Sequence, residues 1–297
     1  GQDENGQDVT NDLSFMCITC SMHVFLPQPS LSIRVWNGSP QDLLIHAAEL
    51  TRTGIGLPAY YNDEVIIPAL MSRGLTLEDA RTYNIIGCVE PQKAGKTEGW
   101  HDAAFFNMCR PLEFVFTNGY DKGELASVQT GDVESFKTFD EFYDAYKRQM
   151  EYQISLLVNA DNAIDQAHME RCPLPFESCM VDDCMARGMC LQEGGAVYNF
   201  TGPQGFGIAN VADSRYAINR LVFDEKKATL GDFKRALALN YGKGFDEITV
   251  AEMTAQIVKE LKQAGRNVSD EDIAAIAKTI MDTKLSDADQ AMCDNLY

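Results

Sequence analysis

Gly87-Cys88-Val89-Glu90-Pro91 is the stretch that most restricts the fold and the function of this chain. It follows an apolar run at 83–86, and we predict one extended strand from that run to Glu90. Alternate side chains of a strand point to the same side, so Cys88 and Glu90 would be presented together. Pro91 lacks a backbone N–H and would keep the strand from continuing as a central member of a sheet. A thiol beside a carboxylate suits catalysis, but a buried cysteine next to a surface glutamate fits the spacing equally well.

The composition of the chain is that of a globular protein. Its 297 residues are 45% hydrophobic and 23% charged, enough for one large domain or two small ones. The net charge of −19 predicts that the chain binds neither nucleic acid nor an anionic membrane, because both would repel it. No apolar run approaches the ~20 residues of a membrane span, and the polar residues 1–12 do not resemble a signal peptide. We therefore expect a cytoplasmic protein.

The cysteines indicate free thiols rather than a disulfide framework. There are nine of them, an odd number that is sparse for a chain of this length. The first set is Cys172, Cys179, Cys184 and Cys190, whose spacing lacks the CxxC pairs typical of zinc or iron–sulfur sites, so we expect no metal there. The second set is Cys17 and Cys20, which have CxxC spacing without a thioredoxin-like context. We expect both sets to pack in the core.

Apolar periodicity predicts strands that alternate with helices, which is typical of an α/β fold. Strands are expected at 31–36 and 196–200, besides the one at 83–90. We expect a helix at 103–117 with a kink at Pro111, and two separate helices at 138–158 and 161–170. Further helices are predicted at 63–71, 76–83, 180–187, 210–223, 229–239, 250–264 and 270–282, with caps at Thr76 and Ser269.

Several motifs in a fixed order resemble those of the glycyl radical enzymes, the pyruvate formate-lyase superfamily. Gly87-Cys88-Val89-Glu90-Pro91-Gln92 resembles the cysteine-loop signature of that family. The other motifs are QPSLSIR at 28–34, GKTEGWHD at 95–102, RCPLPF at 171–176 and YNFTGPQG at 198–205. The similarity extends from near residue 1 to about residue 240. It points to the branch that holds glycerol and propane-1,2-diol dehydratases, choline trimethylamine-lyase and isethionate sulfite-lyase.

The resemblance implies a fold and a set of site residues. Residues 1–297 would be the central part of a ten-stranded α/β barrel of the pyruvate formate-lyase type, with the cysteine loop projecting inside. Cys88 would become a thiyl radical that abstracts a hydrogen atom, and Glu90 would act as a general base on the substrate hydroxyl. Asp102 would contact a substrate hydroxyl, and His101 would be a weaker contact. A carboxylate at Asp102 suits a neutral diol or the choline cation and would repel a sulfonate.

The resemblance also implies an activity and its requirements. We expect cobalamin-independent dehydration of glycerol or propane-1,2-diol to an aldehyde, with isethionate or choline as alternative substrates. No bound cofactor is expected; the glycyl radical would lie outside this chain, which has no Arg-Val-x-Gly-Tyr motif, and a radical-SAM activase would install it. The full-length protein would be a homodimer in an anaerobic bacterium, in the cytoplasm or a microcompartment. A non-catalytic or split subunit that needs a partner with the glycyl domain is the alternative class.

Overall fold

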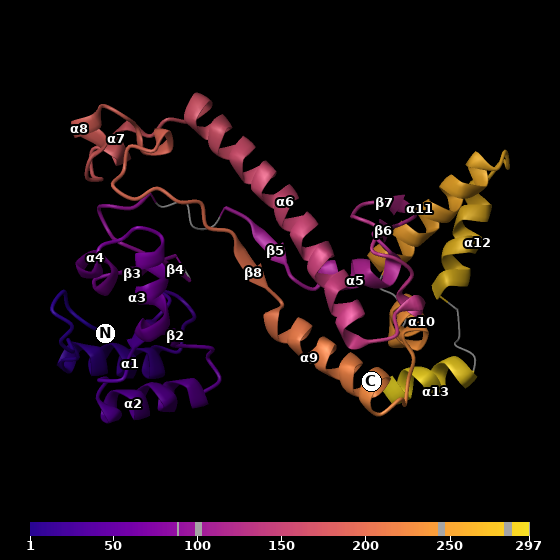
Figure 1. The fold of residues 1–297 in the computed structure, drawn as a ribbon, viewed down its shortest axis with the longest axis horizontal. Helices are drawn as coiled ribbons and strands as arrows, with labels where there is room; N and C mark the ends of the chain where they lie inside the picture. Colours follow the sequence, from indigo (N-terminus) through magenta and orange to yellow (C-terminus); the bar gives the residue numbers. More distant parts are fainter. Residues whose placement is uncertain (88, 99–102, 243–246, 282–286, 297) are drawn as a thin grey trace. The chain divides into compact units, whose positions relative to one another are not determined.

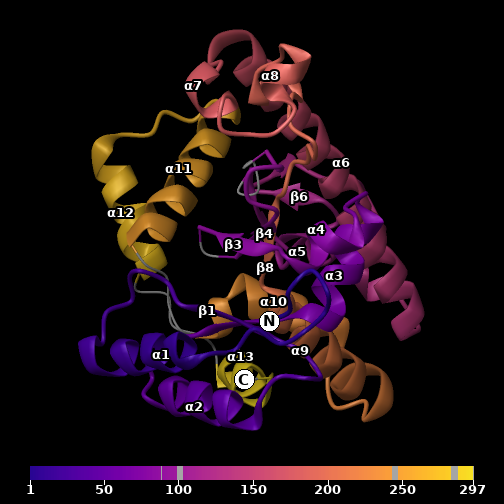
Figure 2. The ribbon, with the colours of Figure 1, turned by 90° about the vertical axis from the view of Figure 1, so that its left-hand side faces the viewer.

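The computed structural model describes residues 1–87, 89–98, 103–242, 247–281 and 287–296. The chain divides into two compact units. The first consists of Gly1–Phe105 and Ala160–Gln204, and the second of Phe106–Asn159 and Gly205–Tyr297. Figure 1 gives the order of the elements, and Figure 2 shows the same elements after a 90° turn.

The first unit begins with a parallel pair of strands. β1 (Ser32–Val35) pairs with β2 (Ala59–Asn62), which confirms the strand predicted at 31–36. The connection contains α2 (Gln41–Arg52), since parallel neighbours need a crossover, and α1 (Asp12–Val24) precedes β1. The apolar side chains that these elements bury together are Ile18, Ile33, Leu43, Ala47 and Leu50.

Two short helices connect this sheet to the segment of the cysteine loop. α3 (Asp63–Ser72) follows β2 directly, and α4 (Leu77–Arg81) comes next. The predicted cap of α4 is confirmed, because the Thr76 hydroxyl accepts a hydrogen bond from the backbone N–H of Asp79 at 3.2 Å. β3 (Asn84–Ile86) and β4 (Glu90–Gln92) then form an antiparallel pair. The buried side chains around these elements are Tyr61, Ile67, Leu70, Leu75, Ala80 and Tyr83.

The first unit is completed by a second, distant part of the chain. It contains the end of α6 (Phe139–Arg171), α7 (Pro175–Ser178), α8 (Cys184–Arg187) and a 3₁₀ turn at Leu191–Glu193. The strand predicted at 196–200 is wrong: only Tyr198 forms an isolated parallel bridge, to Thr97. This bridge brings the motif at 198–205 to the loop that follows β4.

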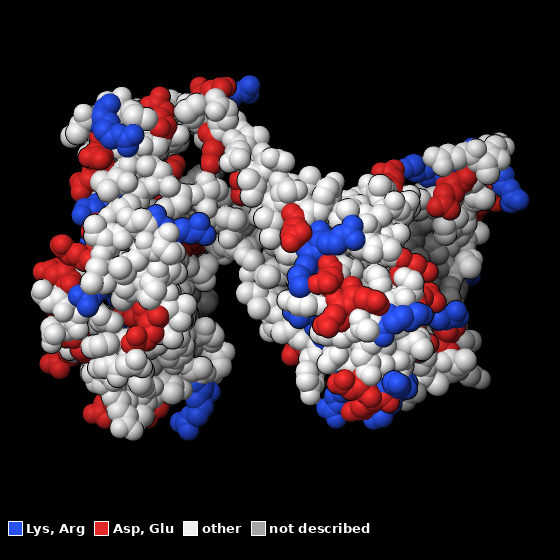
Figure 3. Space-filling model, viewed as in Figure 1, with Lys and Arg blue, Asp and Glu red and all other residues white. Residues whose placement is uncertain are grey.

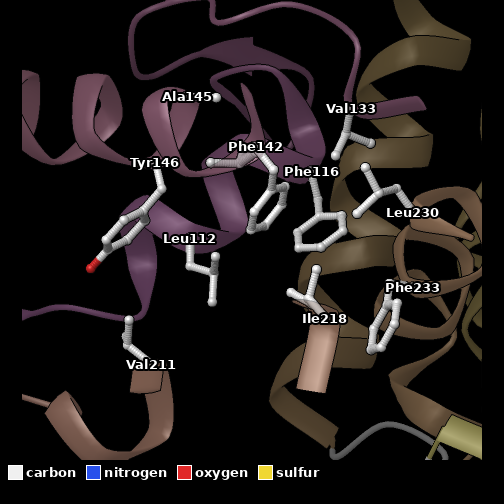
Figure 4. Packing of buried hydrophobic residues seen from close by; sticks show 11 residues of the cluster. Leu112, Phe116, Val133, Phe142, Ala145, Tyr146, Val211, Ile218, Leu230 and Phe233 are labelled. Carbon is white, nitrogen blue, oxygen red and sulfur yellow. The ribbon is translucent and has the colours of Figure 1, made fainter. Parts of the chain in front are cut away.

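The second unit is built around the first two-thirds of α6. It also contains three helices, a short hairpin and a 3₁₀ turn. These are α5 (Arg110–Thr117), the hairpin of β6 (Tyr120–Asp121) and β7 (Glu124–Leu125), the 3₁₀ turn Val133–Ser135, α9 (Ile208–Ile218) and α10 (Leu230–Ala238). Figure 4 shows side chains from α5, α6 and α9 converging on one apolar core. Within it the rings of Phe116 and Phe142 lie 5.7 Å apart, centroid to centroid. This burial is the main source of stability for the second unit.

The remaining elements of the second unit follow the core along the chain. A π-helical turn at Asn219–Asp224 continues α9, and a 3₁₀ turn at Asn240–Gly242 follows α10. α11 (Glu247–Gln263) and α12 (Asp270–Met281) are the predicted helix pair, and Ser269 caps α12 as expected. α13 (Asp287–Leu296) was not predicted. β5 (Phe105–Asn107) pairs with β8 (Gln204–Phe206), where the chain passes from one unit to the other.

Two helix predictions are wrong for clear reasons. The helix expected at 103–117 is instead β5 followed by α5, and Pro111 lies in the first turn of α5, where a missing N–H costs nothing. The helices expected at 138–158 and 161–170 are one 33-residue helix, α6. Between them the chain has no proline or glycine, so nothing ends the helix.

Two features of the described residues concern membranes and charge. Among the described residues, no helix is long and apolar enough to cross a membrane. Figure 3 shows acidic and basic side chains interspersed over the visible face.

Candidate active site

The cysteine loop is a tight β-hairpin rather than one extended strand. β3 ends at Ile86 and β4 begins at Glu90, and these two residues lie opposite each other in the register. Gly87 has a φ of 62°, a left-handed conformation that turns the chain. The predicted continuous strand at 83–90 is therefore wrong. Pro91 lies inside β4, which is possible because a strand of a two-stranded sheet has one unpaired edge.

Of the predicted site residues, Glu90 belongs to the described part of the chain. Cys88, His101 and Asp102 lie outside the described residues, so their roles stay predictions. The residues on either side of Cys88, Gly87 and Val89, are described. Within the described residues, the candidate site consists of Glu90 and of the contacts that hold its hairpin in place.

The carboxylate of Glu90 is enclosed and receives hydrogen bonds at both oxygens. Glu90 is only 8% exposed. The backbone N–H of Val89 donates to Oε2 at 2.8 Å, and the side-chain amide of Gln204 donates to Oε1 at 2.7 Å. A Cβ atom on Gly87 would lie 2.6 Å from Oε2, so the carboxylate occupies the space that glycine leaves open. The loop sequence therefore fixes the position of this side chain.

A buried ion pair supports the start of the hairpin. Arg34 on β1 donates from Nε and Nη2 to the two carboxylate oxygens of Asp63, whose side chain is 0% exposed. The hydroxyl of Tyr83 donates to Asp63 Oδ1 at 2.8 Å, and its ring lies 4.0 Å below the Arg34 guanidinium. Burial and the neighbouring Asp63 carboxylate raise the pKa of Tyr83, so the phenol stays protonated. Since Tyr83 directly precedes β3, this network fixes the base of the hairpin.

A second network holds the loop after β4. Lys96 Nζ contacts both oxygens of Asp79 at 2.9 and 3.1 Å, and the hydroxyl of Tyr198 donates to Asp79 Oδ2 at 2.7 Å. Burial opposes the charge on Asp79, but the hydrogen bonds from Lys96 and Tyr198 outweigh it and lower the pKa of this carboxyl. The backbone N–H of Glu98 also donates to the carbonyl of Tyr198 at 3.0 Å. The segment 93–98 is thus attached both to α4 and to the motif at 198–205.

Glu98 lines a cavity that sequence reasoning missed. The cavity has a volume of about 400 Å³ and is lined by residues that include Glu98, Asp165, His168 and Thr201. Burial, and then the Asp165 carboxylate, raise the pKa of Glu98 to about 7. Asp165 accepts a hydrogen bond from the Thr201 hydroxyl at 2.7 Å. Helical spacing places Asp165 and His168 on one face of α6, but no sequence signal pairs that face with Glu98.

The cysteines divide between core and surface. Cys184 is buried with Leu191 and Ala196, as predicted for core packing. The same prediction is wrong for four others, whose side chains are exposed: Cys17, Cys20, Cys172 and Cys179. Cys17 and Cys20 lie on α1, a helix whose buried residue is Ile18. Among the described residues, no three His, Cys, Asp or Glu side chains are grouped in a way that could hold a metal ion.

Comparison with known families identifies the class of this protein. The pyruvate formate lyase-like family matches residues 1–287, so the chain belongs to this family of glycyl radical enzymes. The fold class is accordingly α/β, and the chain is part of the α/β barrel of that family. In the described part of the chain, each sheet has two strands.

The similar proteins include several dehydratases. A solved structure concerned with 1,2-propanediol dehydration in Roseburia inulinivorans is 65% identical with a TM-score of 0.86, over 99% of this chain and 35% of that one. The glycerol-bound B12-independent glycerol dehydratase of Clostridium butyricum is 53% identical with a TM-score of 0.72, over 94% and 34%. A (2S)-3-sulfopropanediol dehydratase of Klebsiella oxytoca is 39% identical over 81% of this chain and 29% of its own length. The chain thus spans about a third of the length of these relatives.

Proposed function

We propose that this chain is part of a glycyl radical diol dehydratase, in which Cys88 abstracts the hydrogen atom and Glu90 is the base. The observation that carries the proposal is the buried carboxylate of Glu90, which two hydrogen bonds hold two residues from Cys88. A general base must be held within reach of the proton that it accepts. The similarity to structures described for propanediol and glycerol dehydration supports the choice of a diol.

The reaction balances without an external oxidant or reductant. A glycyl radical outside this chain, installed by a radical-SAM activase, would supply the unpaired electron. Cys88 takes a hydrogen atom from C1 of the diol, and Glu90 takes the proton of the hydroxyl on the same carbon. The C2 hydroxyl leaves as water with that proton, and the Cys88 thiol returns its hydrogen atom to C2. The products are an aldehyde and water.

The remaining predicted residues and partners fit this scheme. Asp102 would accept a hydrogen bond from the diol, with His101 as a second contact. The burial that encloses Glu90 also restricts water, which would otherwise quench a reactive radical. A homodimer of the full-length protein is part of the same proposal.

Anaerobic activation of the full-length protein tests the substrate. After treatment with a radical-SAM activase, we expect aldehyde from glycerol or propane-1,2-diol. Isethionate and choline are assayed in parallel, because related lyases act on other hydroxy compounds. Sulfite release without aldehyde from any diol would contradict the proposal.

Substitution of the two catalytic residues tests the mechanism. Cys88→Ala should abolish turnover while the protein still folds, as circular dichroism would show. Glu90→Gln should lower kcat by at least about 100-fold, because the base is lost. The same substitution at exposed Glu170 is the control and should leave kcat unchanged. Retained turnover in Cys88→Ala would refute the radical role of the thiol.

A further inference from the structure

The contact between Gln204 and Glu90 links two strands that are far apart in sequence. The residues are 114 positions apart, and Gln204 Nε2 lies 2.7 Å from Glu90 Oε1. The other carboxylate oxygen receives the backbone N–H of Val89 at 2.8 Å. The carboxylate of Glu90 therefore accepts one hydrogen bond at each oxygen, from the Gln204 amide of β8 and from the Val89 backbone in the hairpin.

The chemistry of the pair fixes the direction of this hydrogen bond. An ionised carboxylate has acceptors only, so the amide must turn its NH₂ group toward Glu90. Hydrogen bonds to an ionised acceptor are about twice as strong as those between neutral groups. Unlike a lysine or arginine, the amide adds no charge, so Glu90 can gain a proton without leaving a cation unpaired beside it.

The segment that carries Gln204 is held by a backbone hydrogen bond and by a side-chain hydrogen bond of Thr201. The backbone N–H of Gln204 donates to the carbonyl of Ala104 at 2.7 Å. Three residues earlier, the Thr201 hydroxyl donates to Asp165 on α6 at 2.7 Å. The amide is therefore presented by an anchored segment, as a positioning group needs to be.

We propose that Gln204 is a positioning residue for the proposed reaction, which orients the Glu90 carboxylate toward the substrate hydroxyl. The inference rests on the proposed role of Glu90 as the base. Proton transfer is sensitive to geometry, and a shift of about 1 Å can lower the rate by about 100-fold. Loss of the amide leaves one oxygen of Glu90 without this donor and widens the range of positions that the carboxylate samples.

The test replaces Gln204 in the full-length, activated protein. Gln204→Met keeps the volume of the side chain and removes the donor, and Gln204→Asn keeps the amide but shortens its reach. Both should lower kcat by about 10- to 100-fold and change KM by less than about threefold. Both should also increase the solvent deuterium isotope effect on kcat, because proton transfer becomes slower relative to the other steps. Gln41→Met, at an exposed position at the start of α2, is the matched control and should change neither quantity.

The radical content of each variant, measured by electron paramagnetic resonance, separates catalysis from folding and activation. A loss of kcat at equal radical content with an unchanged isotope effect would overturn the proposal, and so would wild-type kcat in Gln204→Met. An increase in KM alone would make Gln204 a substrate contact instead. If the wild type acts on isethionate or choline, the diol proposal fails while Gln204 is tested on that substrate. Full activity of Glu90→Gln would overturn both proposals.

Discussion

Arg34 and Asp63 are joined by two parallel hydrogen bonds, from Nε to Oδ1 at 2.9 Å and from Nη2 to Oδ2 at 2.8 Å. The same guanidinium also donates to the carbonyls of Tyr83 at 3.0 Å and Arg81 at 2.7 Å. One side chain of β1 therefore fixes the start of α3, the end of α4 and the residue that precedes β3. The position of the cysteine hairpin depends on a contact outside the hairpin.

Removal of this guanidinium should destabilise the first unit. Arg34→Ala leaves the buried Asp63 carboxylate without a cation, so the free energy of unfolding should fall by about 3–5 kcal/mol. Arg34→Lys should recover only part of this, because an ammonium cannot make both parallel bonds. Urea denaturation gives the values. The exposed pair Lys147–Asp144 is the control, where Lys147→Ala should lower the free energy of unfolding by less than about 1 kcal/mol. An equally small decrease in Arg34→Ala would contradict the structural role of Arg34.

Substitution of Gly87 should affect both stability and catalysis. Gly87→Ala places a Cβ 2.6 Å from Glu90 Oε2 in a residue with a φ of 62°. Gly95 is the matched control, with a φ of 73° and no atom within 4 Å of its added Cβ. Backbone strain should cost both variants about 1 kcal/mol or more in unfolding free energy. Only Gly87→Ala should also lower kcat; equal kcat in the two variants would show that the carboxylate tolerates the methyl group.

The stability of the protein should depend on the ionisation of Glu98. Its pKa is raised from 4.5 to about 7 in the folded state, so the folded protein binds more protons than the unfolded chain between these values. The contribution of this group is therefore present at low pH and is lost as pH rises from about 4.5 to about 7. Glu98→Gln should remove that loss and make stability at pH 8 higher relative to pH 5 than in the wild type.

Denaturation at the two pH values measures this effect, and NMR of carbon-13-labelled glutamate gives the midpoint directly. Asp165, His168 and Cys172 also line the cavity, so the titration is followed at Glu98 itself. Glu170→Gln, at an exposed position on the same helix as Asp165, is the control and should leave the pH dependence unchanged. A Glu98 midpoint near 4.5 would refute the prediction.

Gln149 should be essential for the fold of the second unit. Its side chain is 0% exposed, its amide donates to the Val128 carbonyl at 2.7 Å, and its Oε1 accepts the Ser127 hydroxyl at 2.6 Å. Gln149→Leu removes these buried hydrogen bonds and should lower the free energy of unfolding by about 2–4 kcal/mol. Gln166→Leu, on an exposed position of the same helix, should cost less than about 0.5 kcal/mol. Similar values for the two variants in urea denaturation would disprove the role of Gln149.

Local signals in the sequence predicted local structure well. Thr76 and Ser269 cap helices, as the spacing to Asp79 and Asp272 indicates, because each cap is made within four residues. The strand at 31–36 was also predicted from its alternation. The prediction of a continuous strand at 83–90 failed because the same sequence pattern is compatible with two structures. The run before Gly87 is compatible with a continuing strand or a hairpin, and only the left-handed φ of 62° at Gly87 distinguishes them.

By itself, the sequence determined the family and the candidate chemistry, because the order of motifs around Cys88 and Glu90 is specific and the match covers residues 1–287. Only the tertiary structure decided what surrounds the base. Gln204 donates a hydrogen bond to Glu90, which lies 114 positions earlier in the chain. Glu98 lines a cavity together with Asp165 of α6, whose carboxylate raises the pKa of Glu98. Spacing along a chain predicts contacts within a helix or a turn, where geometry is fixed by local dihedral angles. Contacts between distant segments depend on how whole elements pack. The contact of Gln204 with Glu90 is of this kind, so only the tertiary structure could show it.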